Sequence, residues 1–221
     1  MTLDLRARRR TALWVAVALV VLAVGVVVAF GITPYPSPPA VAERPDPQVS
    51  ARLAFVRFGA RAPCLHVVDG RGDERELGCD ERYSGDLRWV DDRHVAVRSY
   101  TDGARHVVDV ETAEVTVDAQ VATETLQPEP LAQATSADGH EARTGAGAGS
   151  VWVDVVAPDG AVTRVVEFDA PDGYDLYDAR WSADGRWVAV LDSAQRVLVV
   201  DAAGRVPVRL WASDVGQFAV R

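Results

Sequence analysis

The sequence WSADGRWVAV, from Trp181 to Val190, joins a turn to a strand and decides how the rest of the chain is interpreted. Ser-Ala-Asp-Gly is a turn sequence, because glycine reaches positive φ at low cost and aspartate accepts hydrogen bonds from the nearby backbone. The apolar run that follows, led by an aromatic residue, favours a β-strand. One copy would predict one strand, whereas repeated copies would predict the architecture.

Two related sequences occur earlier in the chain at a constant spacing. WVDDRHVAV begins at Trp89 and TSADGHEAR begins at Thr135, so the three copies start 46 residues apart. The copy at Thr135 lacks the apolar run, and the copy at Trp89 is one residue shorter in its turn. A period of about 40–50 residues with four strands per unit is typical of β-propeller blades. Each blade is expected to have an inner strand that ends at the Trp or Thr, then a turn and three more strands.

The last copy resembles a known repeat. ARWSADGRWVAVLDSAQRVLVVDAAG (179–204) is similar to the WD40-like PD40 repeat of TolB-type propellers, in which Trp-Ser-Pro-Asp-Gly precedes a strand. Ala183 stands where that family favours proline. The resemblance implies a propeller fold and no catalytic residue, because the motif serves the turn and the blade core. TolB-type repeats occur in transport-associated proteins, in accessory domains of peptidases and in sensors.

Short alternating runs separated by turns fill residues 50–221 and predict an antiparallel, all-β, propeller-like domain of about four blades. The first blade, at 51–79, lacks an inner strand, because the preceding segment is rich in proline. GQFAVR, Gly216–Arg221, is strand-like and has no blade of its own. We predict that this tail supplies the missing strand and closes the ring, which would remove an open sheet edge. The alternative is an open half-ring or curled sandwich that a second copy, as a homo-oligomer, or another partner completes.

The amino-terminal part predicts a membrane anchor. Residues 11–32, TALWVAVALVVLAVGVVVAFGI, carry no charge, and a helix needs about 20 such residues to cross a bilayer. Arginines in the tail 1–10 favour a cytoplasmic amino terminus, so the domain at 50–221 would be extracytoplasmic in a single-pass protein of the cell membrane. A cleaved signal peptide is disfavoured by the length of the run. Residues 33–49 contain six of the 12 prolines and predict a semi-rigid linker.

The charge distribution argues against nucleic-acid binding. After residue 11 the chain holds 19 arginines against 31 acidic residues, and the whole chain has a formal net charge of −9. An acidic body repels phosphate backbones. The chain contains neither Lys nor Asn, a usage typical of a GC-rich coding sequence and therefore of a high-GC bacterium.

Cys64 and Cys79 are the two cysteines of the chain and predict a disulfide. A four-residue loop, Gly70–Asp73, would place them opposite each other in a hairpin. Opposed residues of a non-hydrogen-bonded pair have Cα atoms about 4.5 Å apart, which a disulfide accepts. An extracytoplasmic location favours oxidation, with two free buried thiols as the alternative. A redox role would normally use a CxxC motif, and the chain has none.

No enzyme motif appears in the sequence. The four histidines are scattered, HExxH and GxSxG are absent, and the acids of 169–178 lack the spacing of a calcium loop. We therefore expect no catalytic residue, no cofactor and no metal. Tyrosine combines a large apolar area with a polar tip, which makes 169–178 the best candidate for a partner-binding loop. Its candidate contact residues are Tyr174, Tyr177, Asp172 and Asp175.

These observations favour a membrane-anchored binding or scaffold module. It would recognise a protein or cell-envelope component through inter-blade loops, chiefly 80–86, 119–130 and 169–178. A ligand-sensing domain is the first alternative. A hydrolase, or a regulatory domain of an enzyme, is a weaker one, and it would need polar groups that converge in one pocket, such as a His beside two carboxylates.

Overall fold

The protein is described by a computed structural model that covers residues 40–41, 49–58, 61–118, 135–205 and 207–221. The transmembrane helix predicted at 11–32 and most of the linker predicted at 33–49 lie outside these residues. Within the described ranges, no helix has both the length and the apolar character that a membrane crossing requires.

The described residues are almost entirely antiparallel β-structure, as the sequence predicts. One short 3₁₀ helix, η1 (Glu81–Ser84), interrupts the strands. The strands are β1 (Leu53–Phe58), β2 (Pro63–Val68), β3 (Glu74–Cys79), β4 (Leu87–Trp89), β5 (His94–Arg98), β6 (Arg105–Asp109), β7 (Val115–Asp118), β8 (Glu141–Gly147), β9 (Ser150–Val156), β10 (Val162–Asp169), β11 (Leu176–Trp181), β12 (Trp187–Asp192), β13 (Val197–Asp201), β14 (Arg209–Ala212) and β15 (Val215–Val220).

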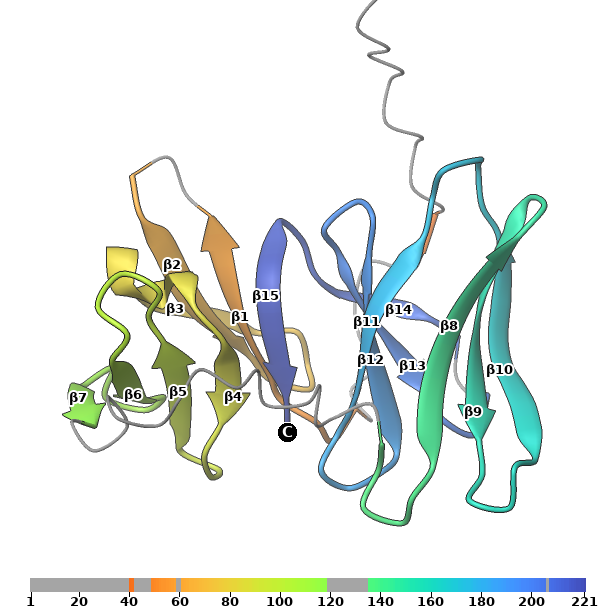
Figure 1. Cartoon of the computed structure of the whole chain (residues 1–221), viewed down its shortest axis with the longest axis horizontal. Helices are drawn as coiled ribbons and strands as arrows, with labels where there is room; N and C mark the ends of the chain where they lie inside the picture. Colours follow the sequence, from red (N-terminus) through yellow and green to blue (C-terminus); the bar gives the residue numbers. More distant parts are fainter. Residues whose placement is uncertain (1–39, 42–48, 59–60, 119–134, 206) are drawn as a thin grey trace, which may run out of the picture. The chain divides into compact units, whose positions relative to one another are not determined.

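These strands form four sheets, which we number along the chain (Figure 1). Sheet 1 has the order β15-β1-β2-β3, and sheet 2 has the order β4-β5-β6-β7. Sheet 3 contains β10-β9-β8, and sheet 4 has the order β11-β12-β13-β14. Four successive antiparallel meanders define a propeller-like fold.

The carboxyl-terminal strand completes the first sheet. β15 pairs with β1 antiparallel, in a register that places Leu53 opposite Val220 and Phe55 opposite Phe218. Backbone hydrogen bonds of 2.9 Å between Arg52 and Arg221 extend the ladder at its end. The prediction that the tail supplies the missing strand of the first blade is confirmed.

The 46-residue repeat corresponds to the inner strands. β4 ends at Trp89 and β11 ends at Trp181, as predicted, and each leads through a turn into the second strand of its sheet. Thr135 forms an isolated bridge with Glu141 at the equivalent place in sheet 3. The residues just before Thr135 lie outside the described part of the chain.

Three buried clusters join the sheets. One packs sheet 1 against sheet 4 around Phe55, Trp187 and Phe218. The second packs sheet 1 against sheet 2, and the third packs sheet 3 against sheet 4. The contacts therefore follow the order 2-1-4-3, and none of these clusters joins sheet 2 to sheet 3. A closed ring of four blades needs that fourth interface, so the described residues show a propeller-like stack with three buried interfaces.

Candidate functional site

A cavity of about 460 Å³ opens between sheets 3 and 4. Its walls come from the ends of β9, β10 and β11, and its rim comes from two copies of the Ser-Ala-Asp-Gly turn. Polar and apolar groups alternate around it. The lining residues are Asp138, His140, Val155, Ala157, Thr163, Trp181, Asp184, Gly185, Arg186, Asp201, Ala202, Ala203 and Arg205.

The turn after β11 is held by its own side chains. The Ser182 hydroxyl accepts the Trp187 backbone N–H at 3.0 Å and donates to Asp184. Asp184 also accepts the Arg186 N–H at 3.1 Å and the hydroxyl of Ser50. Burial raises the pKa of Asp184, but the hydrogen bonds from Ser182 and Ser50 outweigh it and lower the pKa overall. The carboxylate is therefore ionised and fixed at the rim.

The turn at 136–140 repeats this network with one exchange. The Ser136 hydroxyl donates to Asp138 and accepts the His140 N–H at 2.9 Å. His140 stands where the other copy has Arg186, and its Nδ1 lies 3.1 Å from Asp138. Hydrogen bonds from Ser136 and His140 lower the pKa of Asp138. The rim thus presents a histidine–carboxylate pair opposite an arginine and a second carboxylate.

The floor of the cavity contains a buried carboxylate. Asp201 is 1% exposed, and one of its oxygens accepts the Ala203 N–H at 3.0 Å. The other oxygen lies 3.7 Å from Nε of Arg205, whose side chain is mostly exposed. This mixture of carboxylates, arginines and an indole can bind polar groups that carry both donors and acceptors.

Among the described residues that line the cavity, Thr163 carries the hydroxyl group. The hydroxyls of Ser136 and Ser182 are engaged within their turns, and neither lines the cavity. Within the described residues, the acids of the cavity do not converge closely enough to hold a metal ion. This arrangement of polar groups around apolar walls is suited to binding.

The structure separates the residues of the predicted partner-binding loop. Tyr174 is 3% exposed, and its hydroxyl donates to Asp192 at 2.8 Å and accepts from Arg196 at 3.1 Å. Burial raises the pKa of Tyr174, and the hydrogen bond to Asp192 raises it further. Because its hydroxyl is hydrogen-bonded to Asp192 and Arg196 and its ring is buried, Tyr174 belongs to the core and is not exposed for contact with a partner.

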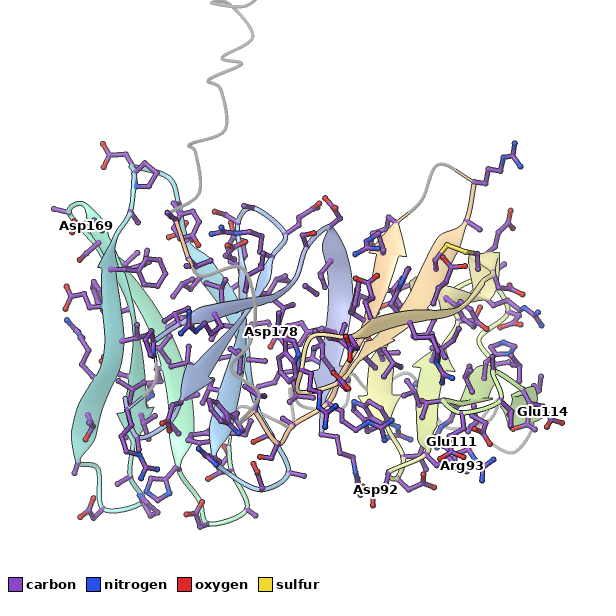
Figure 2. The ribbon with its side chains drawn as sticks, turned by 180° about the vertical axis from the view of Figure 1, so that it is seen from behind. Asp92, Arg93, Glu111, Glu114, Asp169 and Asp178 are labelled. Carbon is purple, nitrogen blue, oxygen red and sulfur yellow. A yellow bond between two sulfur atoms is a disulfide. The ribbon has the colours of Figure 1, made fainter. Side chains whose placement is uncertain are left out.

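The other predicted contact residues remain at the surface. Tyr177 is 53% exposed, Asp172 is exposed and Asp175 is half-buried. Asp169 and Asp178, near the two ends of this segment, lie well apart and do not face a common point (Figure 2). The partner-binding role of Tyr177, Asp172 and Asp175 stays a prediction.

The other two predicted loops are 80–86 and 119–130. In 80–86 the 3₁₀ helix buries Tyr83, and Arg82 lowers the pKa of Asp80 to about 2. All of 119–130 lies outside the described residues. The sequence analysis did not predict the cavity. The signal for it was the Ser-Ala-Asp-Gly sequence at 136–139 and 182–185, because two identical turns in neighbouring blades can lie on the same side of the domain and line one cavity.

The predicted disulfide is present between Cys64 and Cys79, which are directly opposed with Cα atoms 3.9 Å apart. The path to this pairing differs from the predicted hairpin. Val68 pairs with Glu74, so the loop has five residues, and a one-residue bulge at Leu77 restores the register at the cysteines. Asp80 N–H donates to the Pro63 carbonyl at 3.0 Å, which makes the cysteines a non-hydrogen-bonded pair.

Comparison with known proteins gives no family assignment. No family model matches the chain, and no curated protein matches it. Among solved structures, TolB from Acinetobacter baumannii is similar at 15% identity and a TM-score of 0.38, over 78% of this chain and 67% of that one. The tricorn protease is similar at 14% identity and a TM-score of 0.26, over 77% of this chain and 20% of that one.

A puromycin-hydrolyzing peptidase of Mycobacterium tuberculosis is similar at 13% identity and a TM-score of 0.27, over 76% of this chain and 40% of that one. The chain thus spans less than half the length of either peptidase. These TM-scores are too low to support an argument, so the fold assignment depends on the strand order described above.

Proposed function

We propose that this chain is a membrane-anchored, extracytoplasmic binding module that recognises a protein or cell-envelope component. The uncharged segment 11–32 and the arginines before it support the anchor. The acidic body supports a partner other than nucleic acid. The all-β propeller-like domain supports a rigid platform whose turns and loops carry the contacts.

The observation that carries this proposal is the cavity between sheets 3 and 4. It is concave, it has apolar walls at Val155 and Trp181, and ionised groups stand on its rim. A few converging polar groups around apolar walls are typical of ligand sites. The rim would bind a polar side chain or sugar of the partner through His140, Asp138 and Arg186.

The test is partner capture by the full chain, purified in mild detergent and returned to solubilised membranes of its source. The informative variant is His140→Ala, which removes the rim imidazole. The matched control is His94→Ala on sheet 2, because His94 pairs with Asp91 at 2.9 Å much as His140 pairs with Asp138. Side chains of the two histidines have similar exposure, 38% and 35%.

We expect His140→Ala to reduce capture of a specific partner roughly tenfold, since loss of one buried polar contact costs about 1–3 kcal/mol. His94→Ala should capture as the unmodified chain does. Equal capture by both variants would contradict recognition at the cavity. Loss of capture in Tyr177→Ala alone would transfer the interface to the loop at 169–178.

A second candidate function is the sensing of a small ligand, favoured by the volume of the same cavity, about 460 Å³. A small polar molecule bound there would raise the unfolding temperature of the full chain by mass action. His140→Ala would remove that rise, and His94→Ala would not. Screening amino acids, sugars and peptides by thermal shift distinguishes this function from capture of a macromolecule.

A further inference from the structure

Four side chains able to bind a metal ion lie on one face of the β2–β3 hairpin. Cys64 and His66 are two residues apart on β2 and so project from the same face. Glu76 and Cys79 on β3 are directly opposite His66 and Cys64, respectively. The sulfurs of both cysteines and a carboxylate oxygen of Glu76 lie within 4.8 Å of one another.

The bulge in β3 creates this arrangement. Glu76 and Cys79 are three residues apart, and in a regular strand they would point to opposite faces. Leu77 is the extra residue of the bulge, and its side chain packs into the core between sheets 1 and 2. Gly78, at φ +152°, follows it. The bulge therefore returns Cys79 to the face that Glu76 occupies.

His66 is placed to act as the fourth ligand. It is 5% exposed and stacks on Phe55 with ring centroids 5.0 Å apart, which fixes the ring. Its Nδ1 lies 2.8 Å from Glu74, and its Nε2 lies 3.9 Å from Glu76. A metal-binding histidine commonly gives its other ring nitrogen to a carboxylate. Glu74 would hold the ring while Nε2 faces the ion.

We propose that reduction of the Cys64–Cys79 disulfide converts this face into a zinc site with the ligands Cys64, His66, Glu76 and Cys79. Tetrahedral zinc with bonds of about 2.0–2.3 Å needs ligand atoms roughly 3.3–3.8 Å apart. Cys64, Glu76 and Cys79 have ligand atoms within 4.8 Å of one another, whereas His66 is known to be close only to Glu76 of these three, at 3.9 Å, so its ring has the farthest to move to join them. Cys79 and Glu76 are exposed, so a reductant and an ion can reach them.

The chemistry balances with a dithiol as reductant. The dithiol gives two electrons and two protons to the protein disulfide, whose S–S bond breaks, and leaves as its own disulfide. The two protein thiols then lose their protons to water as two Zn–S bonds form. The same sulfurs serve both states, so the covalent bond and the metal exclude each other.

The test uses the full chain in mild detergent, reduced with a dithiol, freed of it without oxygen, and titrated with cobalt(II). We expect thiolate-to-cobalt charge-transfer absorption and the visible bands of tetrahedral cobalt, saturating at one ion per chain and bleached by zinc. The sequence has two cysteines, so this absorption can come only from Cys64 and Cys79. The oxidised chain should show none of it.

Glu76→Gln should weaken cobalt binding by at least ~10-fold while the disulfide of the oxidised protein still forms. The matched control is Glu81→Gln, an exposed acid two residues beyond Cys79 that should bind as the unmodified chain does. Circular dichroism of each reduced protein checks the fold. The proposal is overturned if the reduced chain unfolds, if it gives no tetrahedral cobalt spectrum, or if Glu76→Gln binds as tightly as Glu81→Gln.

Discussion

The inner sheets and the outer sheets of this domain are built from different strand patterns. In sheet 1, the four successive residues Leu53–Val56 are all 0% exposed, and in sheet 4 every residue of β13 is buried. In sheet 3, β9 alternates between buried and half-buried residues, and β6 of sheet 2 does the same. A strand covered on both faces must be apolar throughout, whereas a strand covered on one face needs only alternation.

The burial pattern of these strands follows the position of each sheet in the stack. Sheets 1 and 4 each have two covered faces and lie in the middle of the stack. In the part of the chain that the structure describes, sheets 2 and 3 keep half-buried residues on one face, at Trp152 and Asp154 of β9 and at Arg105 of β6, although β5 of sheet 2 buries Val95–Val97 in succession.

The largest effect is expected when one phenylalanine is removed from a sheet in the middle of the stack and one from a sheet at its end. Phe218 of sheet 1 is 1% exposed, whereas Phe168 of sheet 3 is only partly buried. We expect Phe218→Ala to lower the free energy of unfolding by about 3–5 kcal/mol and Phe168→Ala to lower it by less than about 2 kcal/mol. Urea denaturation measures both. Equal losses would show that the outer sheet is as tightly packed as the inner one.

A smaller effect is expected from the exposed edge of sheet 1. Replacing both cysteines, Cys64→Ser with Cys79→Ser, opens a crosslink of sequence separation 15 and should cost about 2–4 kcal/mol through the freer unfolded chain. Thermal unfolding of the double variant and of the dithiol-reduced, metal-free chain should agree. A loss near zero would mean that the β2–β3 ladder alone holds this edge.

Tyr174, just before β11, and Tyr177, within β11, give the same contrast between a buried and an exposed side chain in one segment. Tyr174→Phe leaves Asp192 and Arg196 without their hydroxyl partner in the core and should cost about 1–3 kcal/mol. Tyr177→Phe changes an exposed side chain and should cost less than about 0.5 kcal/mol. Chemical denaturation of both variants gives the difference. The reverse order would contradict the buried role of Tyr174.

The smallest expected effect concerns pH. Burial lowers the pKa of His66 below its ordinary value of 6.5, and Arg57 adds to this, while Glu74 and Glu76 oppose it. As the pH falls, His66 is therefore protonated in the unfolded chain before it is protonated in the folded chain. Its contribution to the free energy of unfolding is present above pH 6.5 and is lost as the pH drops below that value. Unfolding midpoints between pH 7.5 and 5 should fall, and His66→Gln should flatten the slope. An unchanged slope would show that His66 does not titrate in this range.

Local patterns predicted much of this fold from sequence. Turn and strand signals gave the repeat, the role of the tail at Gly216–Arg221 and the pairing of Cys64 with Cys79. β8 was missed because EARTGAG has no apolar run. The glycine at 145 is explained by its cross-strand partner in the same hairpin, because a Cβ on Gly145 would lie 2.5 Å from the indole of Trp152.

The candidate site was harder to predict because it depends on contacts between distant residues. Tyr174 reads as a surface residue in sequence, but Asp192, 18 residues later, gives its hydroxyl a buried partner. The cavity between sheets 3 and 4 forms only once two turns 46 residues apart are brought together. A local sequence pattern cannot predict that two such distant turns lie side by side.

The pairing of β15 with β1 has a consequence for how the protein is made. A ribosome releases Leu53 long before Val220, its partner in the finished sheet. Until β15 emerges, one edge of β1 stays without its neighbour and is open to wrong pairing. A chain cut before β15 would lack the fourth strand of sheet 1. Completion of the first sheet therefore waits for a strand made more than 150 residues later.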